Sequence, residues 1–251
     1  MRLFPARQLI ALLDPFLPRA CAGCDGTVAG TAGFCSLCLP VVQRIATPCC
    51  RRCKLPMEAF PTSTRGRSGP TLCSSCITSP PAFQEVFACF EYHGAVADAL
   101  RRIKYGGDLP ALRALCRQAR PWAETIVAAL PGQPPLLPLP SHPRELRRRG
   151  FHLPTLAASL LGLPQTYPPT RSPLQKIRPT APQASLTFEA RRSNVEDAFA
   201  WDAPPVEGGS VLLLDDVMTT GATVDAAAQA LLDAGFDDVF VLVIARARRN
   251  F

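Results

Sequence analysis

Two patterns of apolar and polar positions divide the chain, and the change comes near residue 80. From Pro81 onward, short apolar runs alternate with Ala- and Leu-rich segments whose apolar residues recur every three to four positions. The predicted strands are 84–92, 136–139, 211–214 and 239–245, and the predicted helices are 95–105, 109–130, 150–161 and 222–234. Strands that alternate with helices predict an α/β domain, in which helices cover both faces of an open, mostly parallel sheet.

The segment before residue 80 lacks this periodicity but holds nine of the eleven cysteines. A Cys-x-x-Cys pair lets two thiolates bind one tetrahedral ion, and two pairs complete a site of four thiolates. Four pairs therefore predict two structural zinc ions, which would replace the core that so short a segment cannot build. We predict a zinc-binding module at 1–80 and the α/β domain at 81–251. The predicted ligands are Cys21, Cys24, Cys35, Cys38, Cys50, Cys53, Cys73 and Cys76.

The spacing leaves the pairing of these knuckles open. Sequential pairing places the first four cysteines on one ion and the last four on the other, whereas a crossed arrangement mixes them. Cys49 is treated as a spare thiol, although its position beside Cys50 makes the choice between the two ambiguous. A disulfide framework would need an oxidising compartment and an export signal, and a redox Cys-x-x-Cys normally occurs once, on a βα unit.

The positive charge of the chain is concentrated in the cysteine-rich segment. Residues 1–80 hold nine Lys/Arg and three Asp/Glu, a net charge of +6, whereas residues 81–251 hold 18 and 17. A small basic module fits contact with nucleic acid, or it reflects only an arginine-rich composition. The first apolar run is too short for a signal peptide, and no stretch reaches about 18 apolar residues. We therefore expect a cytoplasmic protein without a membrane span.

The strongest functional signal follows the predicted strand 211–214. Two carboxylates come at its C-terminal end, where open α/β sheets bind ligands, and a threonine-rich turn then opens a helix. Backbone N–H groups, hydroxyls and the helix dipole suit a phosphate, and a glycine lets the backbone approach it closely. Carboxylates beside such a turn fit ribose hydroxyls, with Mg2+ nearby. The residues are Asp215, Asp216, Thr219, Thr220, Gly221, Ala222 and Thr223.

Residues 211–223 closely resemble the phosphoribosyl pyrophosphate (PRPP) motif of type I phosphoribosyltransferases. The whole chain resembles the ComF/GntX family, which joins a double zinc ribbon to such a domain. Segments 138–143 and 147–151 look like the family's Pro-x-Pro-x-His and Arg-Arg-Arg-Gly-Phe signatures, and segments 180–186 and 191–199 also match. One departure is that Gly-Phe-His-Leu stands at 150–153, where the family usually has Gly-Phe-Asn-Gln.

The resemblance implies a type I phosphoribosyltransferase fold. The turn would hold the 5′-phosphate, and Asp215 and Asp216 would be the catalytic carboxylates that anchor the ribose of Mg2+-bound PRPP. Segment 141–149, taken as a strand-to-helix loop, would be the pyrophosphate loop, with a solvated charged face as the alternative for its arginines. Segment 171–194 would be a flexible hood, and Lys104 is a further candidate or a helix-ending cation. The other candidate PRPP contacts are Ser141, Arg149, Lys176 and Arg191.

Two kinds of function fit these expectations. A transferase would release pyrophosphate while an acceptor attacks C1 of the ribose, but no base-recognition pocket or general base is evident in the sequence. A non-catalytic module would sense PRPP or bind nucleic acid on the same fold. Because ComF members are linked to DNA uptake, the resemblance implies single-stranded DNA and uptake proteins as partners, and GntX-like members are linked by name to gluconate utilisation. We favour a PRPP-binding competence protein and leave transferase activity open.

Overall fold

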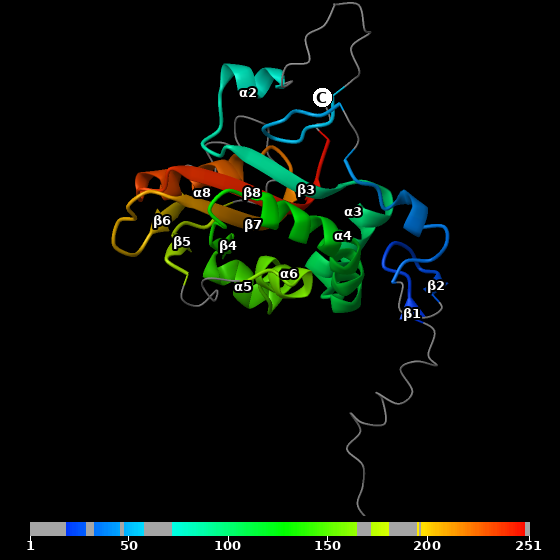
Figure 1. Ribbon diagram of the computed structural model, residues 1–251. Coiled ribbons are helices and arrows are strands. Elements are labelled where there is room, and N and C mark those ends of the chain that lie inside the picture. The colour runs from blue at the N-terminus through cyan, green and yellow to red at the C-terminus, as the bar shows by residue number, and fades with distance from the viewer. Residues whose placement is uncertain are drawn as a thin grey trace, which may run out of the picture.

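Four parallel strands in the order β3-β8-β7-β4 form the centre of the computed structural model (Figure 1). The structure describes residues 19–28, 33–45, 48–57, 72–164, 172–180, 195 and 197–248. Most residues of the central strands are apolar and buried, as parallel strands covered on both faces require. The strands are β3 (Glu85–Glu91), β4 (Leu136–Pro138), β7 (Ser210–Met218) and β8 (Asp238–Arg246).

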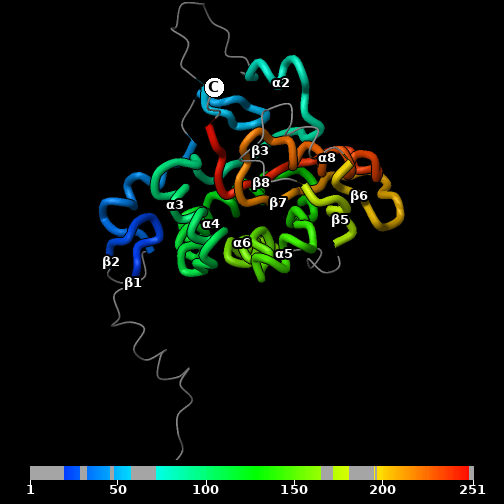
Figure 2. Tube along the Cα trace, turned by 180° about the vertical axis from the view of Figure 1, so that it is seen from behind, coloured from blue at the N-terminus to red at the C-terminus, as the bar shows by residue number. Residues whose placement is uncertain are grey.

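Helices cover both faces of this sheet, which confirms the predicted α/β architecture. The helices α3 (Gly94–Gly106), α4 (Leu109–Ala129) and α6 (Leu153–Leu161) share one apolar core with it. On the other face, α8 (Ala222–Asp233) shares a second core with α2 (Ser74–Thr78). Figures 1 and 2 show these two layers from opposite sides. In the part of the chain that the structure describes, no helix combines the length and apolarity needed to cross a membrane.

Residues 141–149 were expected to form a loop, and this expectation is wrong. Most of the segment forms the helix α5 (Pro143–Arg149). Pro143 suits the first helical position, and the His142 ring accepts a hydrogen bond from the Arg144 N–H at 3.2 Å. Gly150 then ends the helix with a φ of 78°.

Strand β7 is longer than the predicted 211–214, so Asp215 and Asp216 lie within it and not beyond its end. The strand continues because β8 also runs on beside it, pairing Asp215 with Val243 and Met218 with Arg246. Both carboxylates still stand among the last four residues of β7, at the C-terminal edge of the sheet. Two shorter antiparallel pairs lie outside the sheet, β1 (Arg19–Ala20) with β2 (Thr27–Val28) and β5 (Leu174–Lys176) with β6 (Phe199–Trp201).

The cysteine-rich segments pack on opposite faces of the sheet. The β1–β2 unit and the 3-10 helix η1 (Leu39–Val41) lie beside α3, whereas α2 lies over the other face (Figures 1 and 2). The first unit packs so closely that a Cβ at Gly23 would lie 2.6 Å from the Cβ of Ala95 on α3. The division of the chain at residue 80 stays a prediction, and both cysteine-rich units share apolar cores with the sheet domain.

Candidate functional site

Two neighbouring aspartates on β7 form the acidic part of the site. Asp216 is buried and Asp215 half-buried, and the Asp216 N–H donates to Asp215 Oδ1 at 2.8 Å. Burial, followed by the Asp216 carboxylate, raises the pKa of Asp215 to about 7, although Lys104 and Lys176 act against that rise. One carboxyl of the pair therefore carries a proton for a large fraction of the time at neutral pH.

Lys104, in the last turn of α3, is the cation that contacts this pair. Its Nζ lies 2.8 Å from Asp216 Oδ1, and the Asp216 side chain is only 9% exposed. Burial would lower the pKa of Lys104, but the Asp216 carboxylate outweighs that effect and raises it. The sequence offered Lys104 as a ligand contact or as a helix-ending cation, and the structure places its ammonium on the Asp216 carboxylate.

The threonine-rich turn connects β7 with α8, next to the carboxylates. Gly221 has a φ of 92°, a left-handed conformation that favours glycine, and a Cβ there would lie 2.5 Å from Met218 Cε. The Thr220 hydroxyl accepts a hydrogen bond from the Ala222 N–H at 3.3 Å. Thr219, Thr220 and Thr223 are all half-buried. The turn thus brings threonine side chains and the positive end of the α8 dipole to the same edge as the two acids.

The arginines of α5 differ in exposure, which the sequence could not show. Arg149 is half-buried, and its charge opposes the rise in the Lys104 pKa. Burial lowers the pKa of His152, and the Arg149 charge adds to that effect. The other three, Arg144, Arg147 and Arg148, are exposed. Arg149 is therefore the least exposed arginine of α5 and lies near Lys104 and His152, while Ser141 is half-buried just after β4.

His152 stands where the ComF/GntX signature usually has asparagine, and its ring bonds to residues on two elements. Its Nε2 bonds to the Leu139 carbonyl at 3.0 Å and its Nδ1 to the Thr155 hydroxyl at 2.6 Å. Because the carbonyl only accepts, Nε2 is the protonated nitrogen. The imidazole thus connects the end of β4 to the first turn of α6.

Strand β5 lies within the predicted hood, 171–194, and pairs with β6, which lies beyond it. Lys176 on β5 approaches Glu145 of α5, with 3.4 Å between Nζ and Oε1, and its charge opposes the rise in the Asp215 pKa. Arg178 is exposed, and Arg191 lies outside the described residues. The structure therefore brings Lys176 to the carboxylate side of the site.

The cysteines cluster in the sequential arrangement, and the crossed alternative is wrong. In each cluster all four Sγ atoms lie within 4.8 Å of one another. The distance is 3.8 Å between Cys24 Sγ and Cys35 Sγ and 3.7 Å between Cys53 Sγ and Cys73 Sγ. A tetrahedral zinc ion with bonds of about 2.3 Å separates its sulfurs by about 3.8 Å, so both donor sets fit zinc. The first quartet is Cys21, Cys24, Cys35 and Cys38, and the second is Cys50, Cys53, Cys73 and Cys76.

Backbone N–H groups point at the sulfurs of both quartets. Burial would raise the pKa of Cys21, but N–H bonds from Cys35 and Gly23 outweigh it and lower that pKa to about 7. The same balance lowers the pKa of Cys50 to about 7. Thiolates prepared in this way are the form that binds zinc. Cys49 lies outside both quartets.

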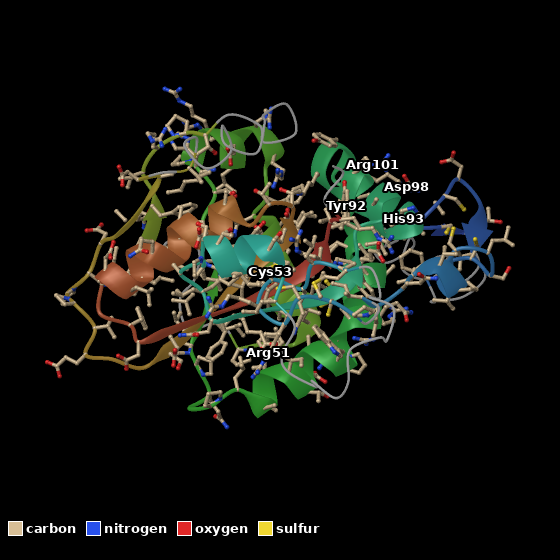
Figure 3. The ribbon with its side chains drawn as sticks, turned by 90° about the horizontal axis from the view of Figure 1, so that it is seen from above. Arg51, Cys53, Tyr92, His93, Asp98 and Arg101 are labelled. Carbon is tan, nitrogen blue, oxygen red and sulfur yellow. The ribbon has the colours of Figure 1, made fainter. Side chains whose placement is uncertain are left out.

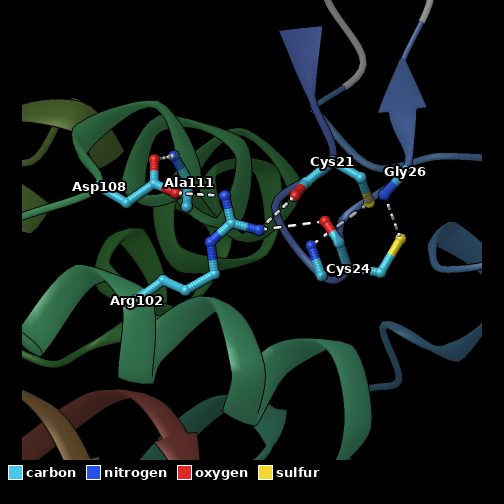
Figure 4. A network of polar contacts seen from close by, with 7 residues as sticks. Cys21, Cys24, Gly26, Arg102, Asp108 and Ala111 are labelled. Carbon is cyan, nitrogen blue, oxygen red and sulfur yellow. Dashed lines mark hydrogen bonds and ion pairs between the residues drawn. The ribbon is translucent and has the colours of Figure 1, made fainter. Parts of the chain in front are cut away.

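Each quartet also has a neighbouring arginine that binds its backbone. At the first quartet, Arg102 of α3 donates to the carbonyls of Cys21 at 2.8 Å and Cys24 at 3.1 Å, and it pairs with Asp108 (Figure 4). At the second, the fully buried Arg246 donates to the Cys53 carbonyl at 2.8 Å. Burial raises the pKa of Cys53 to about 11, and the Arg246 charge acts against that rise.

Arg246 is a residue of this region that the sequence did not single out. Its guanidinium also donates to the carbonyls of Met218 and Thr219, which begin the threonine-rich turn. The available signal was the first of three arginines, at 246, 248 and 249, which follow the apolar strand predicted at 239–245. Long side chains at strand ends usually reach solvent, so the pattern alone did not single it out.

Comparison with known proteins gives several relatives over most of the chain. The chain is 29% identical to DNA utilization protein YhgH of Salmonella typhi, over 85% of this chain and 90% of that protein. It is 24% identical to Competence protein F of Haemophilus influenzae, over 90% and 96%. Competence protein ComFC of Bacillus subtilis is 28% identical over 58% and 57%. No protein-family model matches the chain.

Proposed function

Starting from the membership of this chain in the ComF/GntX family, we propose that it is a PRPP-binding, phosphoribosyltransferase-like protein that acts in DNA uptake or natural competence on the cytoplasmic side. The observation that carries the proposal is the end of β7. There, two carboxylates and a threonine-rich turn stand together at the C-terminal edge of a parallel sheet, where open α/β folds bind ligands. The names of the relatives support a role in DNA handling.

In this proposal each part of PRPP meets a matching group. The turn 219–223 takes the 5′-phosphate on its N–H groups and hydroxyls, and Asp215 and Asp216 take the ribose hydroxyls. The pyrophosphate faces Ser141, Arg149 and Lys176, with Arg191 as a further contact from the hood. Mg2+ would arrive with PRPP and supply positive charge at the pyrophosphate. When the ribose binds, Lys104 either moves away from Asp216 or shares that carboxylate with a ribose hydroxyl.

Whether pyrophosphate leaves C1 is a separate question. As a transferase the protein would break the bond between C1 and the pyrophosphate oxygen, while an acceptor forms a new bond at C1. The cationic groups would then stabilise the departing pyrophosphate. The alternative is a non-catalytic PRPP sensor or nucleic-acid adaptor, since one fold supports both. Pyrophosphate release from PRPP, with and without nucleobases or DNA, distinguishes the two.

PRPP titration by calorimetry tests the proposed site. We expect the double variant Asp215→Ala/Asp216→Ala to lose PRPP affinity by about 100-fold or more, because charge-assisted bonds to both ribose hydroxyls disappear. Asp98→Ala is the matched control, since Asp98 pairs with Arg101 on an exposed part of α3 (Figure 3). Equal affinity in the wild type and the double variant would overturn the ribose assignment.

Single-stranded DNA is the second ligand that we propose, with the cysteine-rich segment as its surface. That segment carries the net charge of +6, and Arg51 and Arg52 lie beside the second quartet. We expect the affinity of the full chain for an oligonucleotide to fall by about tenfold or more when salt rises fourfold.

The variant Arg51→Gln/Arg52→Gln should weaken this DNA binding at low salt. The variant Arg147→Gln/Arg148→Gln removes the same charge from α5 and serves as its control. A larger loss of DNA affinity in the α5 variant would show that DNA binds near α5 and not at the cysteine-rich segment. Absence of binding at low salt would remove DNA as a ligand.

A further inference from the structure

Arg246 joins the second cysteine quartet to the threonine-rich turn. It ends β8, its side chain is fully buried, and it donates to the Cys53 carbonyl at 2.8 Å on one side. On the other side it donates to the carbonyl of Met218 at 3.1 Å and to that of Thr219. One guanidinium thus binds a metal-ligating residue and the two residues that open the turn.

The charge of the quartet suits a buried guanidinium. A buried cation is costly unless it is hydrogen-bonded and close to negative charge. Four thiolates on one divalent ion carry a net charge of about −2, and the quartet is buried at all four positions. Arg246 is therefore held on the quartet by charge and by the Cys53 carbonyl together, and its planar fork leaves donors for the turn.

Direct packing between the quartet and the turn is incomplete. A cavity of about 150 Å³ lies between them, with Cys53 and Cys76 on its metal side and Thr220 and Gly221 on the other. A second connection runs from the Ala82 N–H to Asp225 Oδ1 at 2.7 Å, but it holds the first turn of α8 and not the carbonyls of the turn. The Met218 carbonyl also accepts a hydrogen bond from the Ala247 N–H at 2.9 Å, so the backbone after β8 holds it as well. The Thr219 carbonyl is the one that Arg246 ties to the quartet.

We propose that Arg246 is a positioning residue, which fixes the backbone of the threonine-rich turn so that metal occupancy of the second quartet sets how well the turn binds a phosphate-bearing ligand. The expected effect on ligand affinity rests on the proposed function. The expected effect on the order of the turn does not, because that order can be measured without any ligand.

Arg102 supplies the matched control. It binds two carbonyls of the first quartet as Arg246 binds one of the second, but its other partner is Asp108 of the α3–α4 junction. In Figure 3, Cys53 lies beside α2 near the middle of the molecule, whereas Asp98 and Arg101 mark α3 toward its side. The first quartet is therefore expected to have no influence on the turn.

Hydrogen exchange of the amides at 219–223 tests the inference in the zinc-loaded full chain. We expect Arg246→Lys, which keeps the charge but loses the fork, to speed this exchange by about tenfold. It should also speed zinc loss from the second quartet to a chelator. Arg102→Lys should leave exchange at the turn unchanged. Unchanged exchange in Arg246→Lys would overturn the inference.

Cys73→Ser and Cys35→Ser test the metal directly and do not alter Arg246. Cys73→Ser removes one ligand of the second quartet, and Cys35→Ser removes one ligand of the first quartet. Because loss of the second site also lowers global stability, exchange at 219–223 is compared with exchange of the β3 amides in the same variant. We expect the turn to speed up more than β3 only in Cys73→Ser, and an equal rise in both segments would overturn the inference. If the wild type fails to bind PRPP while these exchange differences appear, the proposed function fails and the positioning role stands. If PRPP binds the wild type and Arg246→Lys equally, the link to ligand affinity fails.

Discussion

A chain in which Cys50 and Cys53 are both serine is expected to bind one zinc ion and to lose most of its folded stability. All four sulfurs of the second quartet are buried, and they share a core with α8 and the sheet. A structural zinc site contributes about 10–16 kcal/mol of binding free energy, which is as large as the whole stability of a typical domain. Zinc content by atomic emission and thermal unfolding measure the two effects.

Two controls sharpen this prediction. Cys49→Ser removes a cysteine that belongs to neither quartet, so it should keep close to two zinc ions and the wild-type unfolding temperature. Cys21→Ser/Cys24→Ser should also lose one ion, but with a smaller loss of stability, because Cys24 and Cys35 of the first quartet are partly exposed. A Cys50→Ser/Cys53→Ser chain that retains two ions would show that the second quartet is not a zinc site.

Asp215→Asn is expected to stabilise the protein at neutral pH. The folded-state pKa of Asp215 is about 7, whereas an unfolded aspartate titrates near 3.9. Between these two values the folded chain binds more protons than the unfolded chain, so this carboxyl makes stability fall as pH rises from about 4 to about 7. Asparagine removes that loss. We expect a gain on the order of 2 kcal/mol at pH 8, allowing for the partial exposure of the side chain, and roughly a third of that gain near pH 5.

Asp216→Asn should change stability in the opposite direction. It removes the carboxylate that lies 2.8 Å from Lys104 and leaves that half-buried ammonium poorly compensated. Urea unfolding of both variants and the wild type between pH 5 and 8 measures the difference, and comparison at equal pH cancels the titration of the cysteines. A destabilised Asp215→Asn at pH 8 would contradict the raised pKa. Both variants should bind PRPP more weakly under the proposed function, because each loses a charged acceptor for a ribose hydroxyl.

The pattern of apolar residues predicted the elements of the α/β domain well, because each is driven by its own periodicity. The strand predicted at 84–92 is observed at Glu85–Glu91, and the helix predicted at 109–130 is observed at Leu109–Ala129. The pattern underestimated the length of β7, because pairing with β8 keeps in the strand the two aspartates that interrupt its apolar run. It also missed α5, where four arginines leave little apolar periodicity and capping at His142 and Gly150 defines the helix instead.

The sequence by itself determined the sheet, the cysteine knuckles and the acidic threonine-rich turn, since each is carried by residues adjacent along the chain. Tertiary structure alone decided how the knuckles pair, that the quartets lie on opposite faces, and that Lys104 binds Asp216. It also decided that Arg246 reaches both Cys53 and the turn. These contacts join residues far apart in the chain, and the free energy that selects them comes from burial and charge compensation, which local patterns do not record.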